Sequence, residues 1–581
     1  MMKRLSATIL ATSMLLANAS LVHANATPDD FAQTKQTAIG TAAHLMEQFG
    51  ITGLTMSLVD AQTGYTWTQG LGYADTLQQL PVDEHTLFQI GSVSKHVTAI
   101  AIMQLVEQGV IDLDEPIVSY IPEFSLLPHP VLGGNSDKIT PRMLLTNTSG
   151  IITDWMYAFF MTGYEHYQGH MNHFLEWVPT RHMRFEAGAQ YEYANAGWTL
   201  LGILVSRMMA HDNYFEGFHH FTQEHIFEPL GMDRSTFVFD AQMTNFARPY
   251  RAGGLQDEMN TIPILSAGSM FSSAYEMSIL MHTLLNGGET HGNRILAQES
   301  VAYMMKNHLT PEQGGVQYGF GLSHSNGFVG HGGGTINYFT MMQLSPEHGL
   351  GVFVSTNTDT GAFIAEALAD MILQSAIAEK FGEVAPNAYT TAIDPHAVPV
   401  ELPQAELEAL VGIYNFTPFG IWNLEVIDGV LTWTGESGYA LIPMSDGSFD
   451  SPMGRYIFTQ TDDSFIARAH TPMGLIQGER ITTDELQNHL APAEFAQFMG
   501  LYHFVPQVEG ELVSIPWFMI FIDELGIPMA LTQLPIGPMP VMLLPAGDEW
   551  LLNGRQPLVF SMEDGVATID MMGATFVRTE Q

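Results

Sequence analysis

The chain has 581 residues, of which 46% are hydrophobic, and this length and composition indicate a globular protein of two to four domains. Its formal charge of −41, from 61 acidic and 20 basic residues, argues against nucleic acid or an anionic membrane as a partner, because both require a basic surface. The acidic excess favours solubility and, more weakly, cationic ligands. Because the chain has no cysteine, disulfides, thiol chemistry and a lipid-modified cysteine are excluded.

Residues 1–26 have the composition of an export signal. Lys3 and Arg4 precede an apolar stretch, and residues 24–26 read Ala-Asn-Ala, the small-x-small form that signal peptidase cuts. A membrane anchor is the alternative, but Ser, Thr and Asn interrupt the apolar stretch. No later apolar run reaches the roughly 18 residues that a membrane span needs. We therefore expect a periplasmic or secreted mature protein with no membrane association after signal cleavage.

The N-terminal half alternates helical and strand patterns. Residues 31–49 predict a helix, and 53–60 and 65–75 predict two strands around a turn. Residues 91–109 predict a second helix, partly buried, that stops at Gly109. Residues 152–185 are rich in aromatic residues and histidine, and they either line a substrate cleft or pack over the body of the protein.

Further elements follow along the chain. A short helical stretch is predicted within 139–151, an apolar helix from 195 to 209, and another helix after the Gly/Ser turn that begins at 266. Residues 327–357 predict two strands flanking Pro346 to Gly349, with the sequence His-Gly-Gly-Gly at the start of the first strand. Glycine at that point permits close approach of a ligand to the backbone.

Ser92 and Lys95 open the helix predicted at 91–109. Residues three apart on a helix share a face, so the Ser92 hydroxyl and the Lys95 amine can meet, whereas Ser94 points elsewhere. A helix N-terminus favours developing negative charge, and a neighbouring lysine can activate an alcohol. The pair predicts a nucleophile, although a helix-capping Ser92 beside a solvated Lys95 would have the same spacing.

Four stretches of sequence add context to this pair. They read FQIGSVSK, LLTNTSGI, YANAGWTLLG with EPLGM after it, and GHGGGT. In this order they resemble the serine β-lactamase and penicillin-binding protein superfamily, specifically the class C β-lactamase-like branch that includes D-aminopeptidases and esterases. The resemblance covers about residues 30–380. It implies an α/β (α+β) catalytic domain over 27–383, in which an antiparallel sheet is flanked by helices and accompanied by an all-helical part.

The resemblance also implies a role for each site residue. Ser92 would be the acylated nucleophile, Lys95 and Tyr193 the base pair, and Asn195 a substrate-contacting amide. Backbone N–H groups of Ser92 and Gly334 would form the oxyanion hole. A lone lysine or tyrosine, with a pKa near 10, is a poor base at neutral pH, but the charge of an ammonium lowers the pKa of an adjacent phenol. The resulting phenolate can accept the serine proton.

The third element of the family is His331-Gly332-Gly333 in this chain. A class C β-lactamase normally has lysine in place of His331 to meet a substrate carboxylate, whereas histidine is typical of the peptidase and esterase relatives. We expect His331 and Gly333 to take part in substrate binding. His331 either orients Tyr193 or binds a substrate group, unless it is only a strand-end histidine with a satisfied hydrogen bond.

Other chemistries lack their signatures. The sequence has no Gly-x-Ser-x-Gly, His-Glu-x-x-His or Gly-Lys phosphate-loop pattern. His219, His220 and His225 lie in a helix-like stretch, where a surface or core role is expected rather than metal binding. We therefore expect no metal and no cofactor.

The C-terminal third contains a repeat. Residues 384–404, with four prolines, predict a linker, and LEALVGIYNF at 407–416 then matches FAQFMGLYHF at 495–504. The two copies, 405–487 and 488–581, have the pattern of small all-β barrel-like domains. Their offset rises from 88 to 102, so the second copy holds about 14 extra residues, which we expect within 508–540. By similarity to D-aminopeptidase-like relatives, this insertion would narrow the active-site cleft. Packing on the body, or dimerisation, is the alternative.

Taken together, these features predict an exported serine hydrolase that forms an acyl-enzyme on Ser92 and hydrolyses amide bonds of small peptides, like a D-aminopeptidase. A carboxylesterase is the near alternative. A β-lactamase, or a penicillin-binding protein that is acylated without turnover, is the more distant one. The expected partners are a small-molecule or peptide substrate and, as an open alternative, a second copy of the chain in a homodimer.

Overall fold

The computed structural model describes residues 30–578 except 129–132, 152–163, 241–242, 252, 260–264, 314–316, 326, 383–396, 417–420, 435–438, 452–453, 462–463, 472–473, 505–516, 524, 535–536, 547–548, 553–555, 564–565 and 572–573. The signal predicted at 1–26 lies outside these residues. The chain divides into two compact units, Met1–Thr391 and Ala392–Gln581. Within the described part of the chain, no helix has the length and apolar character needed to cross a bilayer.

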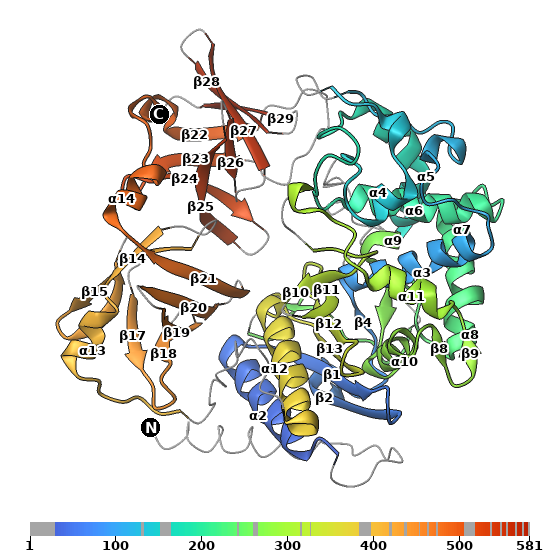
Figure 1. Cartoon of the computed structure of the whole chain (residues 1–581), viewed down its shortest axis with the longest axis horizontal. Coiled ribbons are helices and arrows are strands. Elements are labelled where there is room, and N and C mark those ends of the chain that lie inside the picture. Colours follow the sequence, from blue (N-terminus) through green and yellow to red (C-terminus); the bar gives the residue numbers. More distant parts are fainter. Residues whose placement is uncertain are drawn as a thin grey trace. The chain divides into compact units, whose positions relative to one another are not determined.

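A seven-stranded antiparallel sheet forms the centre of the first unit (Figure 1). Its strands, in spatial order, are β10 (Ser323–Ser325), β11 (Phe328–Gly334), β12 (Phe339–Ser345), β13 (Leu350–Thr356), β1 (Gly53–Asp60), β2 (Tyr65–Asp75) and β3 (Leu80–Pro81). The two predicted strands 53–60 and 65–75 are confirmed at these bounds. Strands β1 and β13, the first and last of this sheet in sequence order, pair directly.

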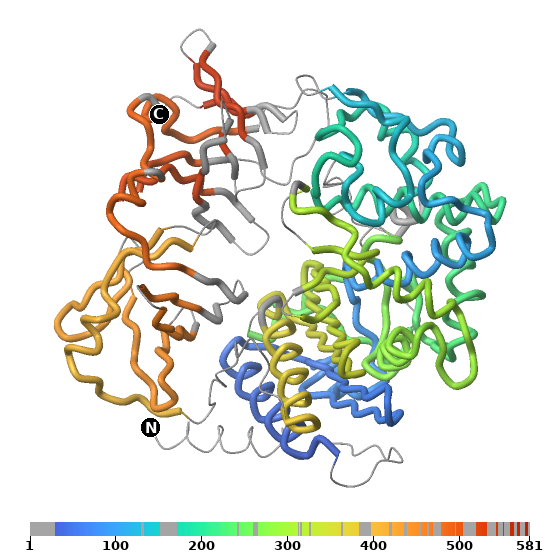
Figure 2. Tube along the Cα trace, viewed as in Figure 1, coloured from blue at the N-terminus to red at the C-terminus, as the bar shows by residue number. Residues whose placement is uncertain are grey.

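Helices cover both faces of this sheet. Helices α2 (Ala32–Phe49) and α12 (Ala362–Phe381) contact each other, and α12 packs on β12 and β13, while α10 (Ala274–Leu285) packs on β13, β1 and β2. Figure 2 shows α2 and α12, from opposite ends of this unit, side by side. Because successive strand residues point to opposite faces, Val352 and Val354 pack with α2 and α12, whereas Phe353 packs in the other core cluster. The helix predicted at 31–49 is confirmed as α2.

The remaining helices form the all-helical part. They are α3 (Ser94–Glu107), α4 (Pro141–Leu145), α5 (Tyr164–Trp177), α6 (Asn195–Met208), α7 (Tyr214–Thr222), α8 (Glu228–Leu230), α9 (Leu265–Gly268) and α11 (Gln298–Met305), with the short strand pairs β4 (Phe88–Gln89) and β7 (Phe271–Ser272), β5 (Tyr250–Arg251) and β6 (Leu255–Gln256), and β8 (Glu289–Thr290) and β9 (Asn293–Arg294). The aromatic-rich stretch 152–185 contains α5, whose Phe174 is fully buried, and its first part lies outside the described residues.

Two predictions in this unit are corrected. Helix α3 was predicted to be partly buried. In the structure every residue from Ser94 to Leu105 is buried, so almost the whole helix lies inside the protein. The segment 327–357 forms three strands instead of two, because the chain turns at 335–338 between β11 and β12. His331 therefore lies midway along β11, and the glycines after it form the end of that strand next to the turn, rather than the start of a longer strand.

The second unit contains two closed eight-stranded barrels. In each barrel, strands that follow one another in the sequence are antiparallel neighbours. The first has β14 (Gly412–Asn415), β15 (Ile421–Ile427), β16 (Val430–Thr434), β17 (Tyr439–Pro443), β18 (Phe449–Ser451), β19 (Gly454–Gln460), β20 (Phe465–Thr471) and β21 (Gly474–Ile481). The second has β22 (Gly500–Phe504), β23 (Trp517–Ile522), β24 (Pro528–Leu534), β25 (Gly537–Ala546), β26 (Glu549–Leu552), β27 (Gln556–Glu563), β28 (Val566–Met571) and β29 (Ala574–Arg578). Short helices α13 (Gln404–Ala409) and α14 (Thr483–Leu486) precede and follow the first barrel.

The predicted fold class, an antiparallel sheet with helices followed by two barrel-like domains, is thus confirmed. Equivalent contacts relate the two barrels. The Tyr414 hydroxyl donates to the Leu410 carbonyl at 2.8 Å, and the Tyr502 hydroxyl donates to the Phe498 carbonyl at 2.7 Å. The two barrels share an apolar cluster that includes Ile421 and Met529. The stretch 508–540, within which the insertion is predicted, lies outside the described residues at 508–516, 524 and 535–536, as does most of the predicted linker.

Candidate active site

Ser92 is placed by a short strand and a tight turn. Strand β4 pairs with β7 and leads into a 3-10 turn, Gly91–Val93, from which α3 continues. Gly91 has φ of 55°, and a Cβ on it would lie 2.7 Å from the backbone nitrogen of Gly334. Glycine is therefore required at 91 both for its left-handed backbone and for the close approach of β11. The Ser94 hydroxyl donates to the Gly91 carbonyl at 2.6 Å and locks the turn.

Two groups, one from the next turn of the same helix and one from 101 residues later in the sequence, meet at the Ser92 hydroxyl. Lys95 Nζ lies 3.0 Å from Ser92 Oγ, and the Tyr193 hydroxyl lies 2.7 Å from the same oxygen. As predicted, the Ser92 hydroxyl is the one that meets the Lys95 amine, whereas Ser94 is fully buried and bonded to its own turn. The alternative in which Lys95 is a solvated side chain is wrong, because Lys95 has no exposed surface.

The Lys95 ammonium is surrounded by oxygen acceptors. Besides Ser92 Oγ, Nζ lies 2.8 Å from Asn195 Oδ1 and 2.7 Å from the carbonyl oxygen of Ala267 on α9. It also lies 4.8 Å from the ring centroid of Tyr193, within the range of a cation–π interaction. A buried charge requires such partners. Asn195 thus orients Lys95 through its amide oxygen, and its contact with substrate stays a prediction.

Asn147 holds the segment that carries Tyr193. Its Oδ1 accepts hydrogen bonds from the backbone nitrogen of Ala194 at 3.3 Å and from Trp198 Nε1 at 3.0 Å. Its carbonyl oxygen accepts from the Glu192 backbone at 2.9 Å. Asn147 has φ of 56°, a left-handed conformation that asparagine tolerates better than most residues. Sequence reasoning selected the stretch LLTNTSGI but assigned Asn147 no role.

The end of β11 lies against the Ser92 turn. A Cβ on Gly333 would overlap the Ile90 carbonyl oxygen and would lie 3.2 Å from the Ser92 backbone nitrogen. Gly334 follows, with its nitrogen beside Gly91. The structure therefore brings the backbone of Ser92 and Gly334 together, as an oxyanion hole would need. Because no side chain fits at Gly333, the backbone is what this position can offer to a substrate.

His331 lies behind the site rather than in it. Its side chain is buried, with Nδ1 2.5 Å from the Gly332 carbonyl oxygen and Nε2 3.1 Å from the Tyr318 hydroxyl. Its ring centroid lies 5.8 Å from that of Tyr193. Burial and the charge of Lys95 lower the pKa of His331 to about 3, so the imidazole is neutral. Since both ring nitrogens are engaged by the protein, this arrangement favours support of Tyr193 over contact with a substrate group.

A second buried histidine, His96, lies edge-on to His331 with the ring centroids 6.2 Å apart. Its Nδ1 lies 2.7 Å from the Val93 carbonyl oxygen, and burial lowers its pKa to about 4. Neither His96 nor Tyr318 was found by sequence reasoning. His96 directly follows Lys95 in the sequence, but on a helix adjacent residues face different directions, and only packing shows that this face is also buried.

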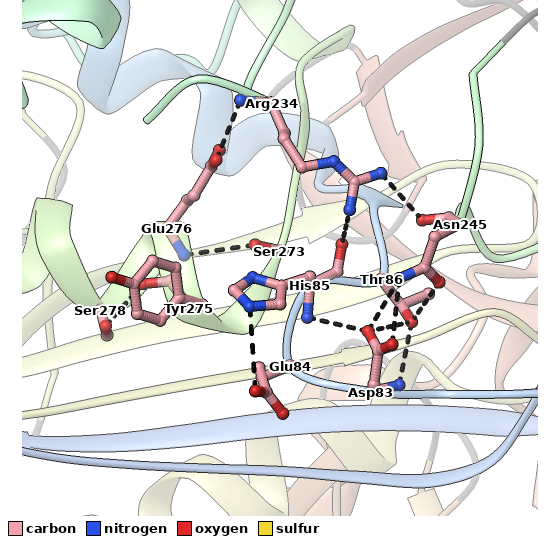
Figure 3. Close-up of polar contacts among 10 residues, drawn as sticks. All are labelled: Asp83, Glu84, His85, Thr86, Arg234, Asn245, Ser273, Tyr275, Glu276 and Ser278. Atoms are coloured by element: carbon pink, nitrogen blue, oxygen red, sulfur yellow. Dashed lines mark hydrogen bonds and ion pairs between the residues drawn. The ribbon is translucent and has the colours of Figure 1, made fainter. Parts of the chain in front are cut away.

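A polar network anchors the segment that leads into β4 (Figure 3). The Arg234 guanidinium donates to the carbonyl oxygens of His85 at 2.6 Å and Thr244 at 2.5 Å. Asn245 Nδ2 donates to Asp83 Oδ1 at 2.9 Å. The buried Glu276 accepts from the Arg234 backbone nitrogen at 2.9 Å. These bonds cross-link the chain just before Ser92 to two other loops and so restrain its position.

The histidines at 219, 220 and 225 do not form a site. Burial lowers the pKa of His219 to about 4. Among the described residues no group of three or more histidine, aspartate or glutamate side chains is arranged to hold a metal ion.

Comparison with known proteins agrees with this geometry. A model of the family named Beta-lactamase matches residues 40–376. Protein flp of Staphylococcus aureus is 22% identical over 50% of this chain and 57% of its own length. Penicillin-binding protein PbpX of Bacillus subtilis is 25% identical over 51% of this chain and 70% of its own length. The human mitochondrial serine beta-lactamase-like protein LACTB is 33% identical over 21% of each chain.

A solved structure extends the similarity to the second unit. The octameric penicillin-binding protein homologue of Pyrococcus abyssi aligns over 94% of this chain and 99% of its own, with 18% identity and a TM-score of 0.52, which shows a shared fold. The match to flp spans just over half of that relative, and the match to LACTB about a fifth. Because the family model covers more than half of the sequence, this chain belongs to the beta-lactamase family.

Proposed function

We propose that this protein is an exported serine hydrolase that is acylated on Ser92 and hydrolyses amide bonds of small peptides, in the manner of a D-aminopeptidase. One observation carries the proposal: the Ser92 hydroxyl lies 3.0 Å from Lys95 Nζ and 2.7 Å from the Tyr193 hydroxyl. A nucleophile within hydrogen-bond reach of two basic groups, one of them oriented by Asn195, is the arrangement that covalent catalysis requires.

The geometry supports a two-step reaction. In the first step Ser92 Oγ attacks the substrate carbonyl while its proton passes to the Tyr193–Lys95 pair, and the backbone N–H groups of Ser92 and Gly334 receive the developing oxyanion. The same proton then goes to the leaving amine, which departs and leaves an ester on Ser92. In the second step water attacks that ester, the pair takes up the water's proton, and Ser92 regains a proton as the acid product leaves.

The surroundings of His331 support a substrate without a carboxylate at this position. A neutral imidazole with Gly332 and Tyr318 on its two nitrogens supplies no positive charge. A β-lactam substrate would rely on such a charge next to the reacting carbonyl, whereas a small peptide amide or an ester would not. A carboxylesterase shares every feature of this argument and is the second candidate.

Reaction with a fluorophosphonate probe tests the proposal without knowledge of the substrate. Wild-type protein should be labelled on Ser92, Ser92→Ala should not, and Ser119→Ala, the same change at an exposed serine, should be labelled like wild type. Turnover of p-nitroanilide and p-nitrophenyl ester panels, including D-amino acid substrates, then separates amidase from esterase. Undiminished turnover by Ser92→Ala would reject the proposal.

A fluorescent penicillin distinguishes the remaining alternative. If the label persists on Ser92 for hours without turnover of any ester or amide, the protein is a penicillin-binding protein rather than a hydrolase. Rapid release with hydrolysis of the drug would instead identify a β-lactamase. The proposed peptidase predicts neither stable labelling nor efficient drug hydrolysis.

Export is proposed on the composition of residues 1–26 alone. N-terminal sequencing of the protein from a bacterial periplasm or culture medium should find a mature chain beginning at residue 27. An intact N-terminus in the cytoplasmic fraction would contradict export while leaving the chemistry of Ser92 untouched.

A further inference from the structure

The two proposed oxyanion donors come from separate segments of the chain. The Ser92 N–H lies in the turn after β4, and the Gly334 N–H lies at the end of β11, before the turn at 335–338. Both N–H groups must point at one substrate oxygen, so their positions have to be held to within about 0.5 Å. One further segment, residues 245–250, is bonded to the chain next to each donor.

On one side, segment 245–250 is bonded to the chain that leads into β4. The Leu87 backbone nitrogen donates to the Asn245 carbonyl oxygen at 3.0 Å, and the Ala247 nitrogen donates to the Leu87 carbonyl oxygen at 2.8 Å. The Asn245 side chain adds a bond, because its Oδ1 accepts from the Thr86 hydroxyl at 2.8 Å (Figure 3). These bonds fix the entry to β4, and β4 continues into the turn that carries the first donor.

On the other side, the same segment holds the turn that follows Gly334. The Tyr338 hydroxyl donates to the Ala247 carbonyl oxygen at 2.6 Å, and Asn337 Nδ2 donates to the Tyr250 carbonyl oxygen at 3.0 Å. Tyr338 and Asn337 are each 2% exposed. Burial raises the pKa of Tyr338 well above its ordinary value, so the phenol keeps the proton that it donates.

Ala247 is where the two sides meet. Its backbone nitrogen donates toward the Ser92 side, to Leu87, and its carbonyl oxygen accepts from the Gly334 side, from Tyr338. Ala247 is 1% exposed, so water does not compete for these bonds. The close contact of Gly91 with Gly334 limits how near the two donor segments come, whereas the bonds to Ala247 limit how far apart they move.

We propose that segment 245–250 fixes the separation of the Ser92 and Gly334 N–H groups, with Asn245 and Tyr338 as the positioning residues toward the two donors. This inference rests on the acylation chemistry and the oxyanion hole proposed for Ser92.

A pair of organophosphorus reagents reports on the oxyanion hole. With diethyl p-nitrophenyl phosphate or diethyl p-nitrophenyl phosphorothioate, Ser92 Oγ bonds to phosphorus, the serine proton passes to the Tyr193–Lys95 pair, and p-nitrophenolate leaves and is measured by its colour. Negative charge develops on oxygen in the first reagent and on sulfur in the second, and sulfur is larger and accepts weaker hydrogen bonds. The phosphate to phosphorothioate rate ratio therefore measures how well the two N–H groups fit an oxyanion. A loss of folded protein slows both reactions equally and leaves this ratio unchanged.

Tyr338→Phe should lower the rate ratio about tenfold relative to wild type, and Asn245→Ala should lower it by a similar factor. The double variant should fall less than about twofold below the lower single variant, because both changes release the same segment. Asn337→Ala removes the other side-chain bond from the turn to segment 245–250 and should also lower the ratio.

Two controls separate this effect from others. Tyr414→Phe loses a buried phenol bond to a carbonyl oxygen, at 2.8 Å, in the second unit, and its rate ratio should stay within about twofold of wild type. Asn147→Ala acts on the segment that carries Tyr193 and should slow both reagents by the same factor, without a change in the ratio.

A wild-type rate ratio in folded Tyr338→Phe and Asn337→Ala would overturn the inference. So would effects of Tyr338→Phe and Asn245→Ala that simply multiply in the double variant, because the two residues would then act independently. Failure of the proposed function is a different result: neither reagent would react with Ser92 in the wild-type protein.

Discussion

The amide oxygen of Asn195 lies 2.8 Å from Nζ of Lys95, although 100 residues separate them in the sequence. This bond joins the first residue of α6 to the buried face of α3. Together with the Ala267 carbonyl at 2.7 Å, Asn195 gives the Lys95 ammonium two fixed acceptors. Its third hydrogen bond goes to Ser92. The position of the lysine is therefore set by three separate segments.

Lys95→Met removes this charge while keeping a side chain of similar length. We expect fluorophosphonate labelling of Ser92 to slow by about a thousandfold, because the phenol that accepts the Ser92 proton loses the neighbouring cation that stabilises its anion. The free energy of unfolding should change by less than about 1 kcal/mol, since the cost of burying an ammonium disappears together with its hydrogen bonds. Lys138→Met, at an exposed lysine paired with Glu186, is the control and should alter neither quantity. Labelling at the wild-type rate would remove Lys95 from the mechanism.

Asn147→Ala should loosen the segment that carries Tyr193. The variant removes the acceptor of Ala194 and Trp198, and we expect it to lower the unfolding free energy by about 2 kcal/mol and to slow labelling by about tenfold. Asn213→Ala removes an asparagine that caps α7 through Glu216 and should cost about 1 kcal/mol without slowing the labelling. Chemical denaturation and labelling kinetics measure the two effects, and equal labelling rates for both variants would show that Asn147 does not position Tyr193.

Asp370 on α12 should make stability depend on pH. Burial, together with the nearby Glu366, raises its pKa from 3.8 to about 6, although Gln374 donates to it at 2.7 Å. The folded chain therefore binds this proton more tightly than the unfolded chain. Its favourable contribution is complete below about pH 4 and is lost as the pH rises through about 6.

Asp370→Asn should accordingly raise the free energy of unfolding at pH 7.5 by about 1–2 kcal/mol and should have almost no effect near pH 4. Asn keeps an oxygen that can accept from Gln374. Asp233→Asn removes the same formal charge at an exposed position. It should change the free energy of unfolding only slightly, and by the same amount at both pH values. Denaturant titrations at the two pH values provide the measurement, and a gain for Asp370→Asn that is the same at both would contradict the assignment.

The two barrels offer a paired test of the repeat. Tyr414→Phe and Tyr502→Phe each delete a buried hydroxyl that donates to a carbonyl four residues earlier. Each should lower the unfolding free energy of the second unit by about 1 kcal/mol and leave Ser92 labelling unchanged. Tyr120→Phe, which removes a hydroxyl bonded to the Asp112 backbone nitrogen in the first unit, is the reference for a loss outside the barrels. If only one of the two barrel variants has a much lower free energy of unfolding, the equivalent tyrosine bonds do not contribute equally to the stability of the two barrels.

The sequence by itself determined the features that depend on short spacing. Alternation of apolar residues predicted β1 and β2 at their observed bounds, and the three-residue spacing of Ser92 and Lys95 predicted which serine meets the lysine, because helix and strand periodicity set which neighbours share a face. Segments that match in the same order in both copies likewise predicted two barrels, since each copy must build the same closed sheet.

Only the tertiary structure decided which groups surround Ser92. Tyr318 carries no local signal, and the stretch that contains Asn147 did not reveal its role, because both residues act through contacts with residues far away in the sequence. The same holds for His331: its place in β11, buried against Tyr193 with both nitrogens engaged, depends on contacts with Tyr318 and on packing against α3. A pattern read along one segment shows which face of that segment is buried, but the partner that buries it comes from another segment, and that partner determines the chemistry.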